Sequence, residues 1–178
     1  MQDWLDFAQK NGLEIKETGR CQLCNSDVKN GIIECIDIAS QITHKLDHEK
    51  GIKHMTIFLC VDAHALQHSE IHGRWNNHYH LTRLNLILKR KIIWNYKLSP
   101  ILSEVIDSYK EKNINEIIRN PDISKRGKLT VKNVDNSISD EEYIKIVWSW
   151  AEEVYKSFEE SHNKVEKISD LFFKRVFA

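Results

Sequence analysis

The sequence predicts an all-α protein, built as a single helical-bundle domain with a cysteine knuckle near its N-terminus. Proline and glycine are scarce, with 2 Pro and 6 Gly among 178 residues. Apolar residues recur at helical spacing, and the alternation typical of strands is rare. The length also fits one domain, since domains commonly have about 100–200 residues. We therefore expect residues 1–178 to fold as one helical unit.

The N-terminal part, residues 1–31, is expected to combine a short helix over Trp4 to Gln9 with a tight loop that carries two cysteines. Longer helices are predicted over 33–48 and 54–68, separated by a turn at Gly51. The second of these is apolar on most of its faces, which is typical of a buried helix. It should therefore lie at the centre of the bundle.

The helical core is predicted to span residues 32–119. After a break at Gly73 to Asn77, leucines at helical spacing indicate a helix near 81–88. A further helix is expected over 98–118, because Pro100 follows Ser99 at a position that suits the first turn.

Residues 120–138 are predicted to form an irregular linker, and residues 139–178 the C-terminal helix. Ser139 and Glu142 have the spacing of a capping box at its start. One face of the helix should be buried, because apolar residues recur on it at helical spacing: Tyr143, Val147, Trp150, Ala151, Val154 and Phe158.

Charge and hydropathy exclude several classes of protein. The 26 basic and 26 acidic side chains cancel, which argues against a histone-like polybasic binder. No apolar run reaches the roughly 18 residues of a membrane span, and the first residues lack the pattern of a secretory signal. We therefore expect a cytoplasmic protein without a membrane partner, whose thiols stay reduced unless a metal holds them.

Cysteine and histidine are unevenly distributed, with eight of the nine histidines between His44 and His80 and three of the four cysteines just before them. Cys21 and Cys24 form a C-x-x-C, the spacing at which two thiolates occupy adjacent corners of a zinc tetrahedron. A thioredoxin-like redox pair is the alternative, but it requires a preceding strand that the sequence does not show. We therefore favour zinc, and the remaining ligands must come from further along the chain.

Helix geometry indicates which residues these are. In a hairpin about Gly51, Cys35 and His68 lie nearly level at the open end, given a rise of about 1.5 Å per residue. His80 is level with His68 across the next turn. We predict a zinc site made by four residues: Cys21, Cys24, Cys35 and His68.

A cleft lined by His64, His80 and Asp62 is expected beside this site. His64 lies one turn before His68, so it is either a further ligand or a buried polar residue. Asp62 is a candidate for orienting an imidazole through its second nitrogen. His44, His48 and His54 are expected at solvated positions without a role. His72 and His78 flank the turn at Arg74, and each is either a fourth ligand or loop surface.

Several of these motifs together resemble an uncharacterised bacterial family, domain of unknown function number 5946. The similarity covers most of the chain and rests on the cysteines and on further pairs: Val61-Asp62, Gln67-His68, His80-Leu81, Leu129-Thr130 and Trp150-Ala151. The chain departs from the pattern at Ile57, where a histidine is common, at His64, where a tyrosine is usual, and at Ser69 in place of a proline. A family metal site using the residue-57 histidine would need His64 or His54 as a substitute here. The resemblance implies no activity.

The functional prediction is a zinc-binding helical protein whose metal is mainly structural, because four protein ligands leave no open position. One alternative is a zinc-dependent hydrolase acting on a small molecule or nucleotide, with Asp62 or Glu70 as general base. No known zinc-hydrolase signature supports it, so enzymatic activity stays open.

A second alternative is a nucleic-acid-binding module that uses the basic segment 82–97, where five Lys and Arg are interleaved with Trp94 and Tyr96. We favour instead that this segment pairs with the acidic residues of 140–160, within the chain or across subunits, because the two charges cancel. The ligand or protein partner is not identified by the sequence.

Overall fold

The computed structural model describes residues 2–10, 12–46, 51–134 and 137–177. These residues form α-helices without a strand, which confirms the predicted all-α class. Their bounds are as follows: α1 Gln2–Lys10, α2 Gly31–Thr43, α3 Ile52–Gln67, α4 Arg74–Leu84, α5 Leu98–Lys112, α6 Asp140–Ser157 and α7 His162–Phe177. Among the described helices, none is long and apolar enough to cross a bilayer.

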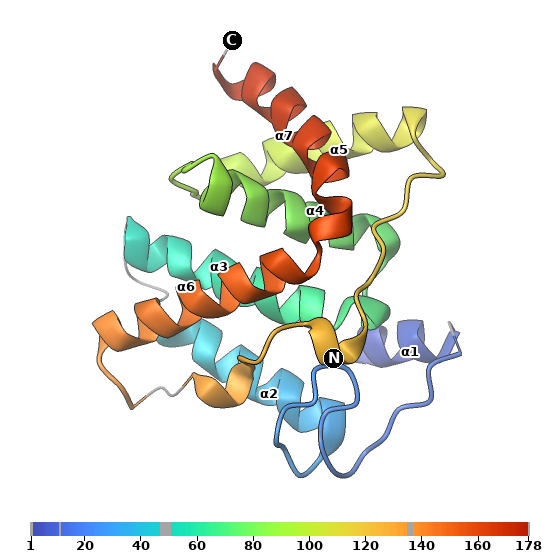
Figure 1. Cartoon of the computed structure of the whole chain (residues 1–178), viewed down its shortest axis with the longest axis vertical. Coiled ribbons are helices and arrows are strands. Elements are labelled where there is room, and N and C mark those ends of the chain that lie inside the picture. The colour runs from blue at the N-terminus through green and yellow to red at the C-terminus, as the bar shows by residue number, and fades with distance from the viewer. Residues whose placement is uncertain (1, 11, 47–50, 135–136, 178) are drawn as a thin grey trace.

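Helix α3 lies at the centre of the fold, as its uniformly apolar sequence predicts. Helix α6 packs along it, and α2 and α4 also contact it. Figure 1 shows α2 and the N-terminal loop at one end of the molecule, and α5 with α7 at the other. Twelve residues of α3 are buried, so this helix is surrounded by the rest of the chain.

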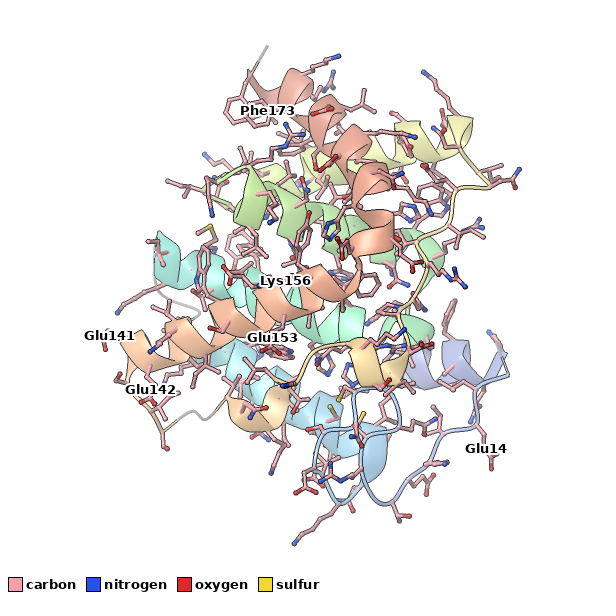
Figure 2. All side chains as sticks on the ribbon, in the orientation of Figure 1. Glu14, Glu141, Glu142, Glu153, Lys156 and Phe173 are labelled. Atoms are coloured by element: carbon pink, nitrogen blue, oxygen red, sulfur yellow. The ribbon has the colours of Figure 1, made fainter. Side chains whose placement is uncertain are left out.

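The predicted apolar stripe of α6 is buried along its whole length, with exposed fractions of 0 to 1%. The Ser139 side chain caps the helix by accepting a hydrogen bond from the Glu142 backbone amide at 3.2 Å. On the stripe, the Tyr143 hydroxyl donates to the Ile42 carbonyl at 2.6 Å, which ties α6 to α2. Glu141 and Glu142 project from the outer end of α6 (Figure 2).

The prediction of one helix over 139–178 is wrong, because the described residues 139–177 of this segment form two helices, α6 and α7. The chain turns at Phe158, which is buried, and a 3-10 turn over Glu159–Ser161 leads into α7. A straight helix over this segment would be about 60 Å long at 1.5 Å per residue, whereas a chain of this length folds to roughly 40 Å across. The turn lets α7 bury its own apolar face against α4 and α5.

Three other helix boundaries differ from prediction. Helix α4 begins at Arg74, within the expected break, because Asn77 is held there by a 3.0 Å hydrogen bond to the Ser69 carbonyl. It continues into a π-helical turn over Asn85–Lys89. Helix α2 ends at Thr43 and α5 ends at Lys112. The predicted end of helix α2, at His48, lies outside the described residues.

Candidate metal centre and histidine cleft

The C-x-x-C lies on a closed loop before α2. The loop is fixed by backbone hydrogen bonds from Cys21 N to Ser26 O at 3.1 Å and from Asn25 N to Cys21 O at 2.8 Å. A second pair of bonds, Gly19 N to Lys29 O and Gly31 N to Gly19 O, closes its base. A short loop closed in this way holds two cysteines near one point, as a zinc knuckle requires.

Two helices supply the other two groups, Cys35 from α2 and His68 from the end of α3. The four ligand atoms of Cys21, Cys24, Cys35 and His68 all lie within 4.8 Å of one another, and all four residues are buried. The His68 Nε2 atom lies 3.3 Å from the Cys21 sulfur and 3.4 Å from the Cys35 sulfur, and the Cys24 and Cys35 sulfurs are 3.6 Å apart. The structure thus contains a buried Cys3His group that could hold a metal ion.

These spacings match the edges of a zinc tetrahedron. With Zn–S of about 2.3 Å and Zn–N of about 2.0–2.1 Å, two sulfurs lie about 3.8 Å apart and a sulfur and a nitrogen about 3.6 Å apart. Three of the six distances between the ligand atoms are 3.3 to 3.6 Å, slightly shorter than these edges, and none exceeds 4.8 Å. A zinc ion would therefore fit between the four groups after small side-chain shifts.

Protonation of the group also favours a cation. Hydrogen bonds from Cys24 and Cys35 hold the pKa of the Cys21 thiol far below its ordinary value, whereas those with Cys21 and Cys24, together with burial, raise the pKa of Cys35 far above its own. Burial opposes charge on His68, but its hydrogen bonds with Cys21 and Cys24 prevail and raise the pKa of His68 to about 10. Neighbouring thiols cannot all ionise without a positive partner. The His68 proton supplies that charge when no ion is bound, and a divalent ion would displace this proton and supply it instead.

A hydrogen bond on the second ring nitrogen fixes the orientation of the His68 imidazole. Its Nδ1 donates to the His64 carbonyl at 2.7 Å, which directs Nε2 toward the sulfurs. A backbone carbonyl on the distal nitrogen is a common partner of a ligating imidazole.

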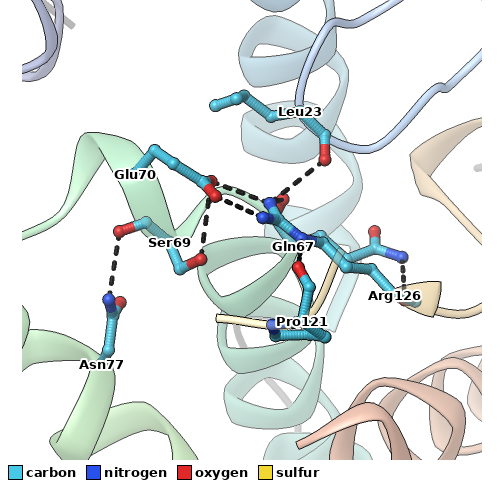
Figure 3. A network of polar contacts seen from close by, with 7 residues as sticks. All are labelled: Leu23, Gln67, Ser69, Glu70, Asn77, Pro121 and Arg126. Carbon is cyan, nitrogen blue, oxygen red and sulfur yellow. Dashed lines mark hydrogen bonds and ion pairs between the residues drawn. The ribbon is translucent and has the colours of Figure 1, made fainter. Parts of the chain in front are cut away.

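A buried network around Arg126 joins this group to the rest of the chain (Figure 3). The guanidinium donates to the carbonyl of Leu23, inside the C-x-x-C, at 3.2 Å and to the carbonyl of Gln67 at 2.9 Å. It also forms a bidentate ion pair with Glu70 and a bond to the Pro121 carbonyl. Arg126 is 3% exposed, so this side chain fixes the knuckle relative to the end of α3.

Segment 120–138 was predicted to be an irregular linker. Its residues 120–134 are largely irregular, but they are bonded to the rest of the chain at several points. The Gln67 amide donates to the carbonyls of Arg126 and Leu129 at 3.0 and 2.8 Å. The Thr130 hydroxyl donates to that of Ser26 at 3.1 Å. Figure 1 shows the segment passing beside the knuckle. This role could not be predicted from the sequence, because an Arg-Gly pair in an irregular segment has no periodicity.

Glu70, a candidate general base by sequence, serves a different purpose. Its carboxylate is held by Arg126 on both oxygens. Glu70 therefore holds the side chain that fixes the knuckle, since both of its oxygens accept from the Arg126 guanidinium.

A cleft of about 400 Å³ opens beside the Cys3His group, between α2 and the ends of α3 and α4. Apolar side chains of α2 and α3 form much of its wall. Four histidines also line it: His44, His64, His72 and His80. The sequence placed His64 and His80 here but expected His44 to have no role, and it left His72 open as either a fourth ligand or loop surface. His48 lies outside the described residues.

Asp62 does not line the cleft, contrary to the prediction, because it is completely buried behind His80. The His80 Nδ1 donates to Asp62 Oδ1 at 2.7 Å, and Arg83 donates to both carboxylate oxygens, at 2.8 and 2.5 Å. Arg83 is itself enclosed by the rings of Phe58 and Tyr79, each 5.0 Å from its guanidinium carbon. This enclosed pair fixes the tautomer of His80, so that Nε2 carries the lone pair.

His64 lies between the cleft and the Cys3His group. Its ring stacks on His68 with centroids 4.0 Å apart, and its Nε2 lies 3.9 Å from the Cys35 sulfur. Burial holds the pKa of His64 well below its ordinary value. His64 is therefore not one of the four residues but lies directly beside them. From this position it can donate a hydrogen bond to the Cys35 sulfur. Ile57 is part of the apolar core, and the four-residue group is complete without it.

The basic segment 82–97 is only partly exposed: Lys89, Lys91, Lys97 and Tyr96 lie at the surface, whereas two of the residues expected to contact nucleic acid are buried. Trp94 is 1% exposed and Arg83 is used internally. Arg90 pairs with Asp170 of α7 at 2.6 Å rather than with the acids of 140–160. The expected pairing between the two segments is therefore not made by these two arginines.

Comparison with protein families matches residues 19–159 to a family of unknown function (DUF5946). This match covers most of the chain, so the protein belongs to that family, as its motifs predicted. Searches of curated proteins and of solved structures found no match.

Proposed function

We propose that this family member is a zinc-binding protein in which Cys21, Cys24, Cys35 and His68 hold one structural zinc ion. The observation that supports the proposal is the convergence of four buried ligand atoms within 4.8 Å. Four protein ligands complete a tetrahedral shell, and three thiolates make zinc electron-rich and a weak Lewis acid. The ion would therefore stabilise the fold rather than activate water.

The functional surface in this proposal is the histidine cleft, which the zinc ion positions. The two share a boundary, because His64 touches the Cys35 sulfur and also lines the cleft. The zinc would fix the ends of α2 and α3, which carry the cleft walls. The occupant of the cleft is a small ligand or ion, since the cleft measures about 400 Å³.

Metal analysis of the full-length protein, purified in reductant, tests this proposal. We expect one equivalent of zinc, tight enough to survive gel filtration. In Cys21→Ser the equivalent is lost, and Tm falls by about 10 °C or more, since 3–4 kcal/mol corresponds to roughly that shift in a domain of this size.

Cys60→Ser is the matched control. Cys60 is a completely buried cysteine whose sulfur lies 3.7 Å from the Thr43 hydroxyl, away from the four-residue group. This variant should keep its zinc. Less than about 0.2 equivalents of any transition metal in the wild-type protein would contradict the proposal.

A further inference from the structure

Two imidazoles of the cleft, those of His72 and His80, lie side by side. Their ring centroids are 5.9 Å apart and their planes are inclined by 52°. With metal–nitrogen bonds of about 2.0–2.1 Å, two imidazoles on one ion have centroids about 5–6 Å apart. The pair therefore has the spacing of two rings that share a metal ion.

The surroundings of His80 are those of a metal ligand. Its Nδ1 donates to Asp62, which leaves Nε2 as the nitrogen with a lone pair. A carboxylate behind the imidazole is a recurrent partner of ligating histidines, because it fixes the ring and raises its basicity. Arg83 holds Asp62 on both oxygens, so the orientation is rigid.

His72 supplies a second nitrogen ligand. Its ring lines the same cleft as that of His80 and comes from the segment between α3 and α4. Imidazole nitrogens are common ligands of transition-metal ions.

We propose that His72 and His80 bind a second divalent transition-metal ion in the cleft, separate from the Cys3His group. The two groups share no residue. The inference rests on the second part of the proposed function, that the histidine cleft binds a small ligand or ion. It names a metal ion as the occupant of that cleft. Imidazole nitrogens select zinc, cobalt, nickel, copper or iron over calcium and magnesium.

An ion held by two side chains keeps coordination positions open, in contrast to the closed Cys3His shell. The cleft has room for water or a small ligand at those positions. This second ion, rather than the first, would be the one that binds a ligand or lowers the pKa of a bound water.

Cobalt(II) titration of the full-length protein loaded with one equivalent of zinc, which fills the Cys3His group alone, tests the inference. Cobalt in the cleft should give ligand-field bands without the sulfur-to-metal charge-transfer band that thiolate ligation produces. We expect one cobalt per chain. His72→Ala and His80→Gln should each weaken cobalt binding at least about 10-fold, and Asp62→Asn about 10- to 100-fold. The Gln side chain at position 80 can still donate to Asp62, which protects the fold.

His162→Gln is the control, because His162 lies on α7 and its ring bonds to the Tyr155 carbonyl. This variant should bind cobalt as the wild type does. The inference is overturned if zinc-loaded wild type takes up no cobalt, or if both cleft variants bind it unchanged. Failure of the Cys3His site gives a different result: metal-free protein would then show no charge-transfer band on adding cobalt.

Discussion

The Arg126 guanidinium donates to the Leu23 carbonyl at 3.2 Å, across 103 positions of sequence. Leu23 lies between the two cysteines of the C-x-x-C, so this bond fixes the knuckle to a segment that the chain reaches only after five helices. Gln67 and Glu70 complete the contact from the end of α3, next to His68. The position of the knuckle thus depends on residues distant in the sequence.

Replacing Arg126 with methionine should destabilise the protein and weaken zinc binding together. The change leaves the Glu70 carboxylate and several carbonyls without their donor, at a cost of about 3 kcal/mol. Thermal melts and competition with a zinc chelator measure the two effects.

Arg119→Met is the control for this variant, since the Arg119 side chain is 81% exposed and pairs only with an exposed Glu160. It should leave both Tm and zinc affinity unchanged. Equal zinc affinity in Arg126→Met and wild type would show that Arg126 does not position the knuckle.

Asp62→Asn should cost about 3–5 kcal/mol, because it leaves the buried Arg83 without its countercharge. A double variant, Asp62→Leu with Arg83→Met, removes both charges and should recover much of that loss. Urea unfolding of the two variants measures the difference. If the double variant is less stable than Asp62→Asn by the full cost of a second independent substitution, the two side chains are not coupled.

His64→Leu should retain one equivalent of zinc, because His64 lies outside the four-residue group. Its affinity should fall by about 10-fold, since the Cys35 thiolate loses the hydrogen bond of the His64 imidazole. Metal analysis measures how much zinc the variant retains, and chelator competition measures its affinity for zinc. Complete loss of zinc from a folded His64→Leu variant would make His64 a ligand and contradict the assignment.

Stability should fall in acid partly through His72. Its pKa is about 3 in the folded protein, against an ordinary value of 6.5. Below pH 6.5 the unfolded chain binds a proton that the folded chain does not, so the free energy of unfolding falls by up to about 1.4 kcal/mol per pH unit toward pH 3. Above pH 6.5 this contribution is fully present.

Comparing wild type with His72→Gln between pH 5 and pH 7, at one equivalent of zinc, isolates this contribution. The variant should lose less stability on acidification. Identical pH dependence of the two proteins would mean that His72 titrates normally in the fold.

Part of the fold and site could be predicted because it follows from local periodicity. The apolar stripe of α6 and the level placement of Cys35 and His68 both come from the geometry of regular helices. The roles of Arg126 and Gln67 could not be predicted, because they depend on tertiary contacts between an irregular segment and the end of α3. The turn at Phe158 was missed for a related reason, since only packing against α4 and α5 shows that one straight helix would leave an apolar face exposed.

The sequence could not show that His44 and His72 line one cleft, because a cleft wall is made jointly by several elements. His44 was expected at a solvated helix end, where it is exposed, and His72 was left open as a fourth ligand or loop surface. Only the packing of α2 beside α3 and α4 brings them to the same cleft.

X-ray absorption at the zinc edge tests the central claim most directly, because it reports the atoms bound to the ion. On protein loaded with one equivalent of zinc, we expect three sulfur ligands at about 2.3 Å and one nitrogen at about 2.0–2.1 Å. In His68→Ala the nitrogen contribution should decrease while the sulfurs remain. A shell of nitrogen and oxygen without sulfur in the wild type would contradict zinc binding by Cys21, Cys24, Cys35 and His68.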